Sequence, residues 1–125
     1  MSSRIAIMLA AVTLAASAAA YADGEHKPKY GGVVAVVKDM EYELVAKPDS
    51  MSVFVEDHGR KVDTKGATAK LVLLTGGDKT EVALVPVGEN GLGAKGMFKV
   101  STGTKVVATI TLAGKPPINA RYEIK

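Results

Sequence analysis

Short apolar segments separated by turn residues recur about every 8–12 residues along this chain, and that spacing restricts its fold more than any other feature. Segments 40–46 and 118–125 alternate apolar with polar side chains, which is the period of a half-buried strand. Asn90-Gly91 is a dipeptide typical of hairpin turns. Helical periodicity is absent after residue 22. The sequence therefore predicts an all-β fold, an immunoglobulin-like β-sandwich of about seven to nine antiparallel strands.

The first 22 residues predict a cleaved secretory signal peptide. Arg4 supplies the charged start, residues 5–20 form a short apolar centre, and the tripeptide at 20–22 has the small-x-small pattern that signal peptidase reads. An uncleaved anchor is the alternative, but this apolar run is shorter than the roughly 20 residues of a spanning helix. We therefore expect export to the periplasm and no membrane span in the mature form.

The remaining chain predicts a flexible polar leader at residues 23–30 and one domain at residues 31–125. Cysteine is absent, which excludes disulfides and thiol chemistry. Basic and acidic residues are interspersed and the net charge is only +3, so a nucleic-acid partner is not expected. Lysines spread over the predicted strands fit protected sheet edges and favour a monomer.

The scarcity of catalytic groups in the sequence predicts that the protein is not an enzyme. Nucleophilic catalysis needs a Ser, Thr or Cys beside a base, and the only imidazoles are His26 in the leader and His58 in a turn. Glu41 and Glu43 share the outer face of one predicted strand, and Glu56 ends the next. We interpret these acids as solvated strand faces, because glycoside hydrolysis needs two carboxyl groups across a cleft.

Metal binding is the sharper hypothesis, with His26, His58 and Asp57 as candidate ligands for copper or zinc. His58 lies in a polar turn at the centre of segment 51–74, a strand, turn and strand around which the other strands assemble. The spacings typical of metal sites, such as H-x-H, are missing. A solvent-facing turn residue is the alternative interpretation of His58.

The segments YGGVVAVVKDMEYELVAKPDSMSVFVEDHGRKVDTKGA and GMFKVSTGTKVVATITLAG resemble a family of small periplasmic β-proteins of β- and γ-proteobacteria. The chain is also similar, more distantly, to the N-terminal β-domain of periplasmic adaptor subunits of heavy-metal efflux pumps. The adaptor resemblance implies metal handling near an N-terminal His-Gly-Gly. In this chain Tyr30 stands where that histidine would precede Gly31 and Gly32.

These observations predict a non-enzymatic periplasmic binding or accessory protein linked to copper-type metal homeostasis. Its predicted partner is then a metal ion. The alternative is a structural or interaction module that binds a protein of the cell envelope through a sheet edge.

Overall fold

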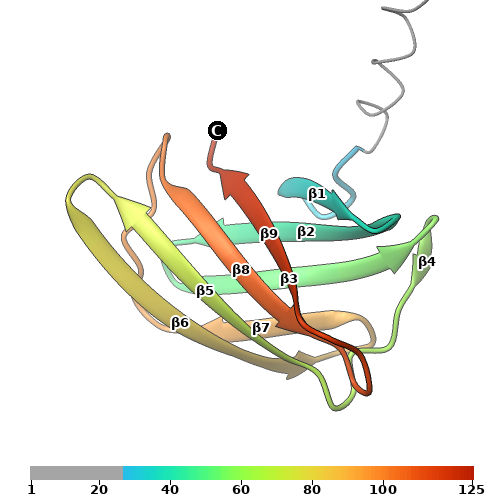
Figure 1. The fold of residues 1–125 in the computed structure, drawn as a ribbon. Coiled ribbons are helices and arrows are strands. Elements are labelled where there is room, and N and C mark those ends of the chain that lie inside the picture. The colour runs from blue at the N-terminus through green and yellow to red at the C-terminus, as the bar shows by residue number, and fades with distance from the viewer. Residues whose placement is uncertain (1–26) are drawn as a thin grey trace, which may run out of the picture.

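A computed structural model describes residues 27–125, which form nine strands and no helix (Figure 1). Residues 1–26, with the predicted signal peptide and His26, lie outside the described residues. The strands are β1 (Val33–Val37), β2 (Met40–Lys47), β3 (Ser50–Asp57), β4 (Arg60–Lys61), β5 (Thr68–Thr75), β6 (Asp78–Val87), β7 (Gly91–Lys95), β8 (Lys105–Thr111) and β9 (Ile118–Glu123). All their pairings are antiparallel. The predicted all-β fold is confirmed, and a helix able to cross a membrane is not found in this part of the chain.

The strands follow the order β1-β2-β3-β7-β6-β5-β8-β9, with β4 paired to β3. Strand β6 belongs to both halves of this order, because residues 78–84 pair with β5 and residues 85–87 pair with β7. Pro86, which has no N–H to donate, lies next to this change of partner. The end strands β1 and β9 lie against each other (Figure 1). The sheet is therefore nearly closed and barrel-like, and its two halves face each other across one core.

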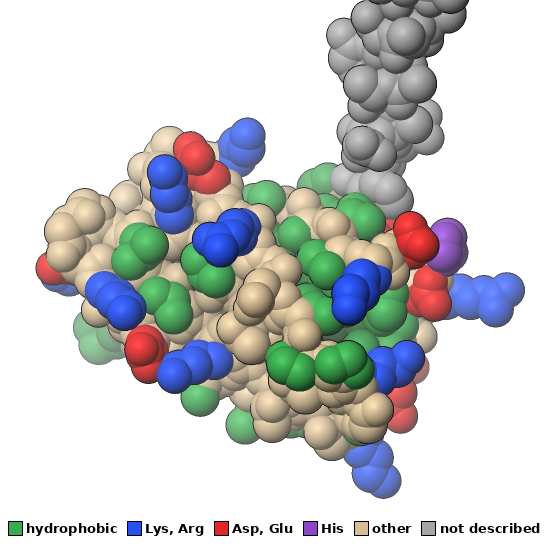
Figure 2. Space-filling model, in the orientation of Figure 1, with side chains coloured by type: hydrophobic (Ala, Val, Ile, Leu, Met, Phe, Trp, Pro, Cys, Tyr) green, Lys and Arg blue, Asp and Glu red, His purple; other side chains and the backbone are tan. Residues whose placement is uncertain are grey.

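The core contains the apolar side chains that alternate inward along the strands, as their period of two predicts. Its fully or almost fully buried members include Leu44, Met51, Val53, Val55, Leu71, Leu73, Leu84, Leu92, Val106, Ala108 and Ile110. On the outer face shown in Figure 2, basic and acidic side chains are interspersed. Segment 51–74 contributes alternate apolar residues of β3 and β5 to this core.

Two hairpin turns contain non-glycine residues with positive φ. Lys38 (φ 51°) and Asp39 (φ 68°) connect β1 to β2, and His58 (φ 52°) with Gly59 (φ 84°) connects β3 to β4. The registers leave only these two residues in each loop. Positive φ at both central residues is the geometry of a type I′ turn, whose twist matches that of the flanking strands. The turn around His58 is therefore a requirement of the backbone, independent of any ligand.

Candidate functional site

The predicted metal ligands that the structure describes, Asp57 and His58, lie side by side at the β3–β4 turn. The Nδ1 atom of His58 is 2.6 Å from the Oδ1 atom of Asp57, and their side chains are 77% and 53% exposed. Figure 2 shows a histidine standing out at the surface beside acidic side chains. Across residues 27–125, no group of three or more His, Cys, Asp or Glu side chains could hold a metal ion. Metal binding by His26, His58 and Asp57 therefore stays a prediction.

Two acids that we expected to be solvated are buried. Glu43 is 4% exposed and Glu56 is 6% exposed. The β2–β3 register places Glu43 opposite Phe54 and Glu41 opposite Glu56, so all four belong to the outer face of the sheet. The end of the leader, from Lys29 onward, covers this face through contacts with both buried acids. The expectation of solvated acids is wrong at these two positions, because a segment distant in sequence packs over them.

The leader is held by backbone and side-chain hydrogen bonds. The Glu43 carboxylate accepts the backbone N–H groups of Lys29 at 2.7 Å and of Tyr30 and Gly32 at 2.8 Å. Glu56 accepts the Lys29 ammonium at 2.7 Å and the Tyr30 hydroxyl at 2.8 Å. Burial raises the pKa of Glu56, but the hydrogen bonds from Lys29 and Tyr30 outweigh it and hold that pKa below its ordinary value of 4.5. We call Lys29, Tyr30, Glu43 and Glu56 the leader latch.

The residues around the leader latch are also packed and hydrogen-bonded within the protein. The Tyr30 ring stacks on Phe54 with ring centroids 4.1 Å apart. Asn90 donates its amide to the Tyr30 hydroxyl and to the Val55 carbonyl, each at 3.2 Å. Among the described residues, every buried side-chain nitrogen and oxygen has a hydrogen-bond partner. A network of this kind stabilises the fold, because each of its buried polar atoms has a partner within the protein. It fixes Lys29 and Tyr30, while the flexibility predicted for the rest of the leader stays a prediction.

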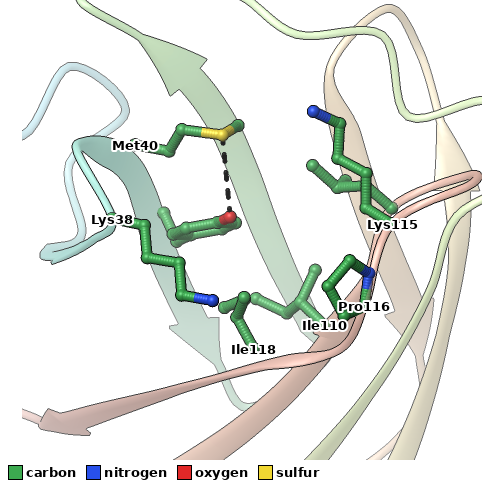
Figure 3. Close-up of a pocket in the computed structure, with 8 residues that line it drawn as sticks. Lys38, Met40, Ile110, Lys115, Pro116 and Ile118 are labelled. Carbon is green, nitrogen blue, oxygen red and sulfur yellow. Dashed lines mark hydrogen bonds between the residues drawn. The ribbon is translucent and has the colours of Figure 1, made fainter.

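A cavity of about 200 Å³ opens at the end of the barrel where β2 begins and β8 ends (Figure 3). Most of its wall is apolar. The lining residues are Met40 and Tyr42 of β2, Ile110 of β8, Ile118 of β9, and Lys38, Leu112, Lys115 and Pro116 of the adjoining turns. Figure 3 shows the side chains of Lys38 and Lys115 approaching this space from opposite sides. The cavity thus combines an apolar interior with two basic residues at its opening.

The polar groups of this cavity are less completely satisfied than those of the latch. The Tyr42 hydroxyl donates to the Met40 sulfur at 3.9 Å, and a thioether is a weak acceptor. Burial raises the pKa of Tyr42, so its hydroxyl keeps its proton at neutral pH. The Tyr122 hydroxyl donates to the Tyr42 carbonyl at 3.0 Å and links β9 to β2 beside the cavity. The Tyr42 hydroxyl is therefore a positioned donor that a stronger acceptor could use.

Neither lysine at the opening has an anionic partner. Lys38 and Lys115 form no ion pair with any carboxylate of residues 27–125. Both side chains are exposed and retain their ammonium groups for other contacts. This arrangement can enclose an apolar group and place a polar atom of the same molecule beside a hydroxyl or an ammonium group.

No local pattern in the sequence predicts this cavity. The alternation that turns Tyr42, Ile110 and Ile118 inward was visible in the sequence. Their meeting at one end of the barrel depends on the near-closure of the sheet, in which β9 lies against β1, and on the pairing of β5 with β8, which are not consecutive strands. Local turn signals predict hairpins and do not predict such a pairing.

The chain was also compared with known proteins. No family model, curated protein or solved structure matches it, so its resemblance to small periplasmic β-proteins and to efflux adaptor domains stays a prediction.

Proposed function

We propose that this protein is a non-enzymatic binding protein that encloses the apolar part of a small ligand in the cavity at the end of its barrel. The observation that carries the proposal is the cavity itself, about 200 Å³ of space walled mainly by apolar side chains. Mouths of β-barrels are among the places where small-molecule sites occur, and such sites pair an apolar lining with a few polar groups. The Tyr42 hydroxyl and the two lysines supply those polar groups here.

The size of the cavity sets the size of the ligand. A buried apolar cavity of roughly 150 Å³ is large enough to bind benzene. The space of about 200 Å³ in this protein therefore has room for one aromatic ring or a short aliphatic chain. Burial of a fragment of that size favours a dissociation constant of about 0.1–1 mM, equivalent to about 4–5.5 kcal/mol.

Two observations make this site a stronger candidate than those expected from the sequence. The Asp57–His58 pair offers two exposed donors that already contact each other. The sheet edges β1 and β9 lie against each other, so each occupies the side on which a partner strand would add. Export to the periplasm remains part of the proposal, because a binding protein there would meet small molecules that enter the envelope.

The test is a titration of the protein with two neutral probes, 1-hexanol and p-cresol, followed by methyl and amide NMR shifts. We expect saturable shifts at Ile110, Leu112 and Ile118. An Ile118→Trp variant fills the cavity and should lose them. The matched control is Val85→Trp, which adds the same ring at a side chain that is 61% exposed outside the cavity, and it should keep them.

The proposal fails if neither probe shifts the cavity residues up to its solubility limit. It also fails if Ile118→Trp, folded as judged by its NMR spectrum, binds as the natural sequence does.

A further inference from the structure

We infer that the ligand of this cavity is a compact organic monoanion, an aromatic or short-chain carboxylate whose charged group lies between Lys38 and Lys115. This inference rests on the proposed function, since it names the class of ligand for the same site. The apolar part of such a molecule would occupy the space between Tyr42 and the isoleucines. Its carboxylate would lie where the two ammonium groups and the Tyr42 hydroxyl line the cavity.

The charge of the lining favours an anion. The lining contains two basic side chains and no acidic one. The ion pairs of residues 27–125 use other lysines, Lys29, Lys61, Lys70 and Lys99, and leave Lys38 and Lys115 without a carboxylate partner. Two unpaired ammonium groups on opposite sides of an apolar opening repel cations and attract a single anion.

The backbone conformation at Lys38 is one that lysine rarely adopts. Type I′ turns favour Asn or Gly, which adopt positive φ at little cost, and lysine does not share that preference. Lys38 nevertheless has a φ of 51°, and Asp39 follows with a φ of 68°. An unfavourable residue in a strained backbone position is an indication that its side chain is needed there. In this case the turn directs the Lys38 side chain toward the cavity opening (Figure 3).

The phenol of Tyr42 also favours an anionic ligand. Its hydroxyl is protonated and has only the Met40 sulfur, 3.9 Å away, as acceptor. A carboxylate oxygen that reached it would gain a charge-assisted hydrogen bond, which is stronger than a bond to a thioether. All three polar groups of the site therefore favour an anionic acceptor, although Lys115 is distant in sequence from Lys38 and Tyr42.

The test compares probes that share an apolar part and differ in charge: hexanoate against 1-hexanol, and 4-methylbenzoate against p-cresol. We expect each carboxylate to bind about tenfold more tightly than its neutral counterpart, which corresponds to about 1.4 kcal/mol. Raising the salt concentration should reduce this preference, because charges at an open site are screened. The double variant Lys38→Gln/Lys115→Gln should bind both members of each pair equally. The control Lys79→Gln removes an exposed lysine of β6, outside the cavity lining, and should keep the preference.

The possible outcomes separate the two proposals. If the neutral probes shift the cavity residues and the carboxylates bind no more tightly, the site binds apolar molecules and the inference about charge is overturned. If the carboxylates bind more tightly but the double variant keeps the preference, the assigned role of the lysines is overturned. If no probe shifts the cavity residues, the proposed function fails and the inference fails with it.

Discussion

The leader latch provides the most direct test of how the fold is held, through the substitution Glu43→Gln. The natural carboxylate accepts three backbone N–H groups, Lys29 on one oxygen and Tyr30 and Gly32 on the other. Glutamine has nearly the same shape but only one acceptor oxygen. At best the glutamine oxygen accepts the N–H groups of Tyr30 and Gly32, and the side-chain NH₂ then faces the N–H of Lys29. One hydrogen bond is therefore lost, and the other two are made to a neutral amide in place of a charged carboxylate.

The magnitude follows from these bonds. Hydrogen bonds to charged groups contribute about 1.5–3 kcal/mol and neutral ones about 1 kcal/mol. Losing one bond and weakening two, with water compensating part of the loss at this partly buried site, gives a destabilisation of about 2–3 kcal/mol for Glu43→Gln. A domain of this size loses about 4–8 °C in Tm for each kcal/mol, so we expect a fall of about 10–20 °C.

The assay is urea and thermal unfolding, with amide hydrogen exchange as a local measurement. The matched control is Glu81→Gln on β6, whose carboxylate forms an exposed ion pair with Lys70. Such pairs contribute about 0–1 kcal/mol, so this variant should change stability little. In Glu43→Gln the amides of Lys29 and Tyr30 should exchange faster. Stability within 0.5 kcal/mol of the natural protein, together with unchanged exchange at these amides, would refute the role of the latch.

Three further predictions concern single positions. The pKa of Glu56 is lower in the folded protein than its ordinary value of 4.5, so the stability that Glu56 contributes is present above pH 4.5 and is lost as the pH falls through the lowered pKa. The Tm difference between the natural protein and Glu56→Gln should therefore narrow below about pH 4.5. A Tm difference that stays constant with pH would contradict this linkage. Gly32→Ala should lower the Tm by more than 10 °C, because a Cβ there would collide with the Leu44 carbonyl oxygen, whereas Gly77→Ala has open space around its Cβ and should change the Tm far less. Equal effects of the two substitutions in differential scanning calorimetry would argue against the close approach of Gly32, which precedes β1, to β2. His58→Asn should keep or slightly raise the Tm, because asparagine tolerates the positive φ of this turn, and a loss of more than 5 °C would show that the imidazole itself stabilises the fold.

Much of the fold follows from local patterns in the sequence. The alternation at residues 40–46 predicts β2 to within one residue, and the apolar face of residues 51–56 predicts β3. Apolar residues at 97, 98 and 100 favour a strand by composition, but the structure has none there, and Met97 is 97% exposed. The backbone there is fixed by Phe98, whose N–H donates to the Pro48 carbonyl in a distant turn.

The candidate sites were harder to predict, for a physical reason. His58 stood out because imidazole is chemically versatile, yet the structure shows it as an exposed turn residue. Glu43 was assigned to the solvent because it lies on the outer face of β2, and its burial results from contacts with a segment that precedes β1. Alternation identifies which face a side chain is on, but it does not reveal what covers that face.

Strand β6 has a consequence for how the molecule opens. Because residues 78–84 complete one half of the barrel and residues 85–87 complete the other, separating the halves requires that both ladders of one strand break. The domain should then unfold as one cooperative unit, with the slowest-exchanging amides of β3 and β8 reporting the same free energy. The turns of Lys38 and Lys115 line the cavity at the end of the barrel, so a ligand of the proposed site would pass between them while both ladders of β6 stay intact.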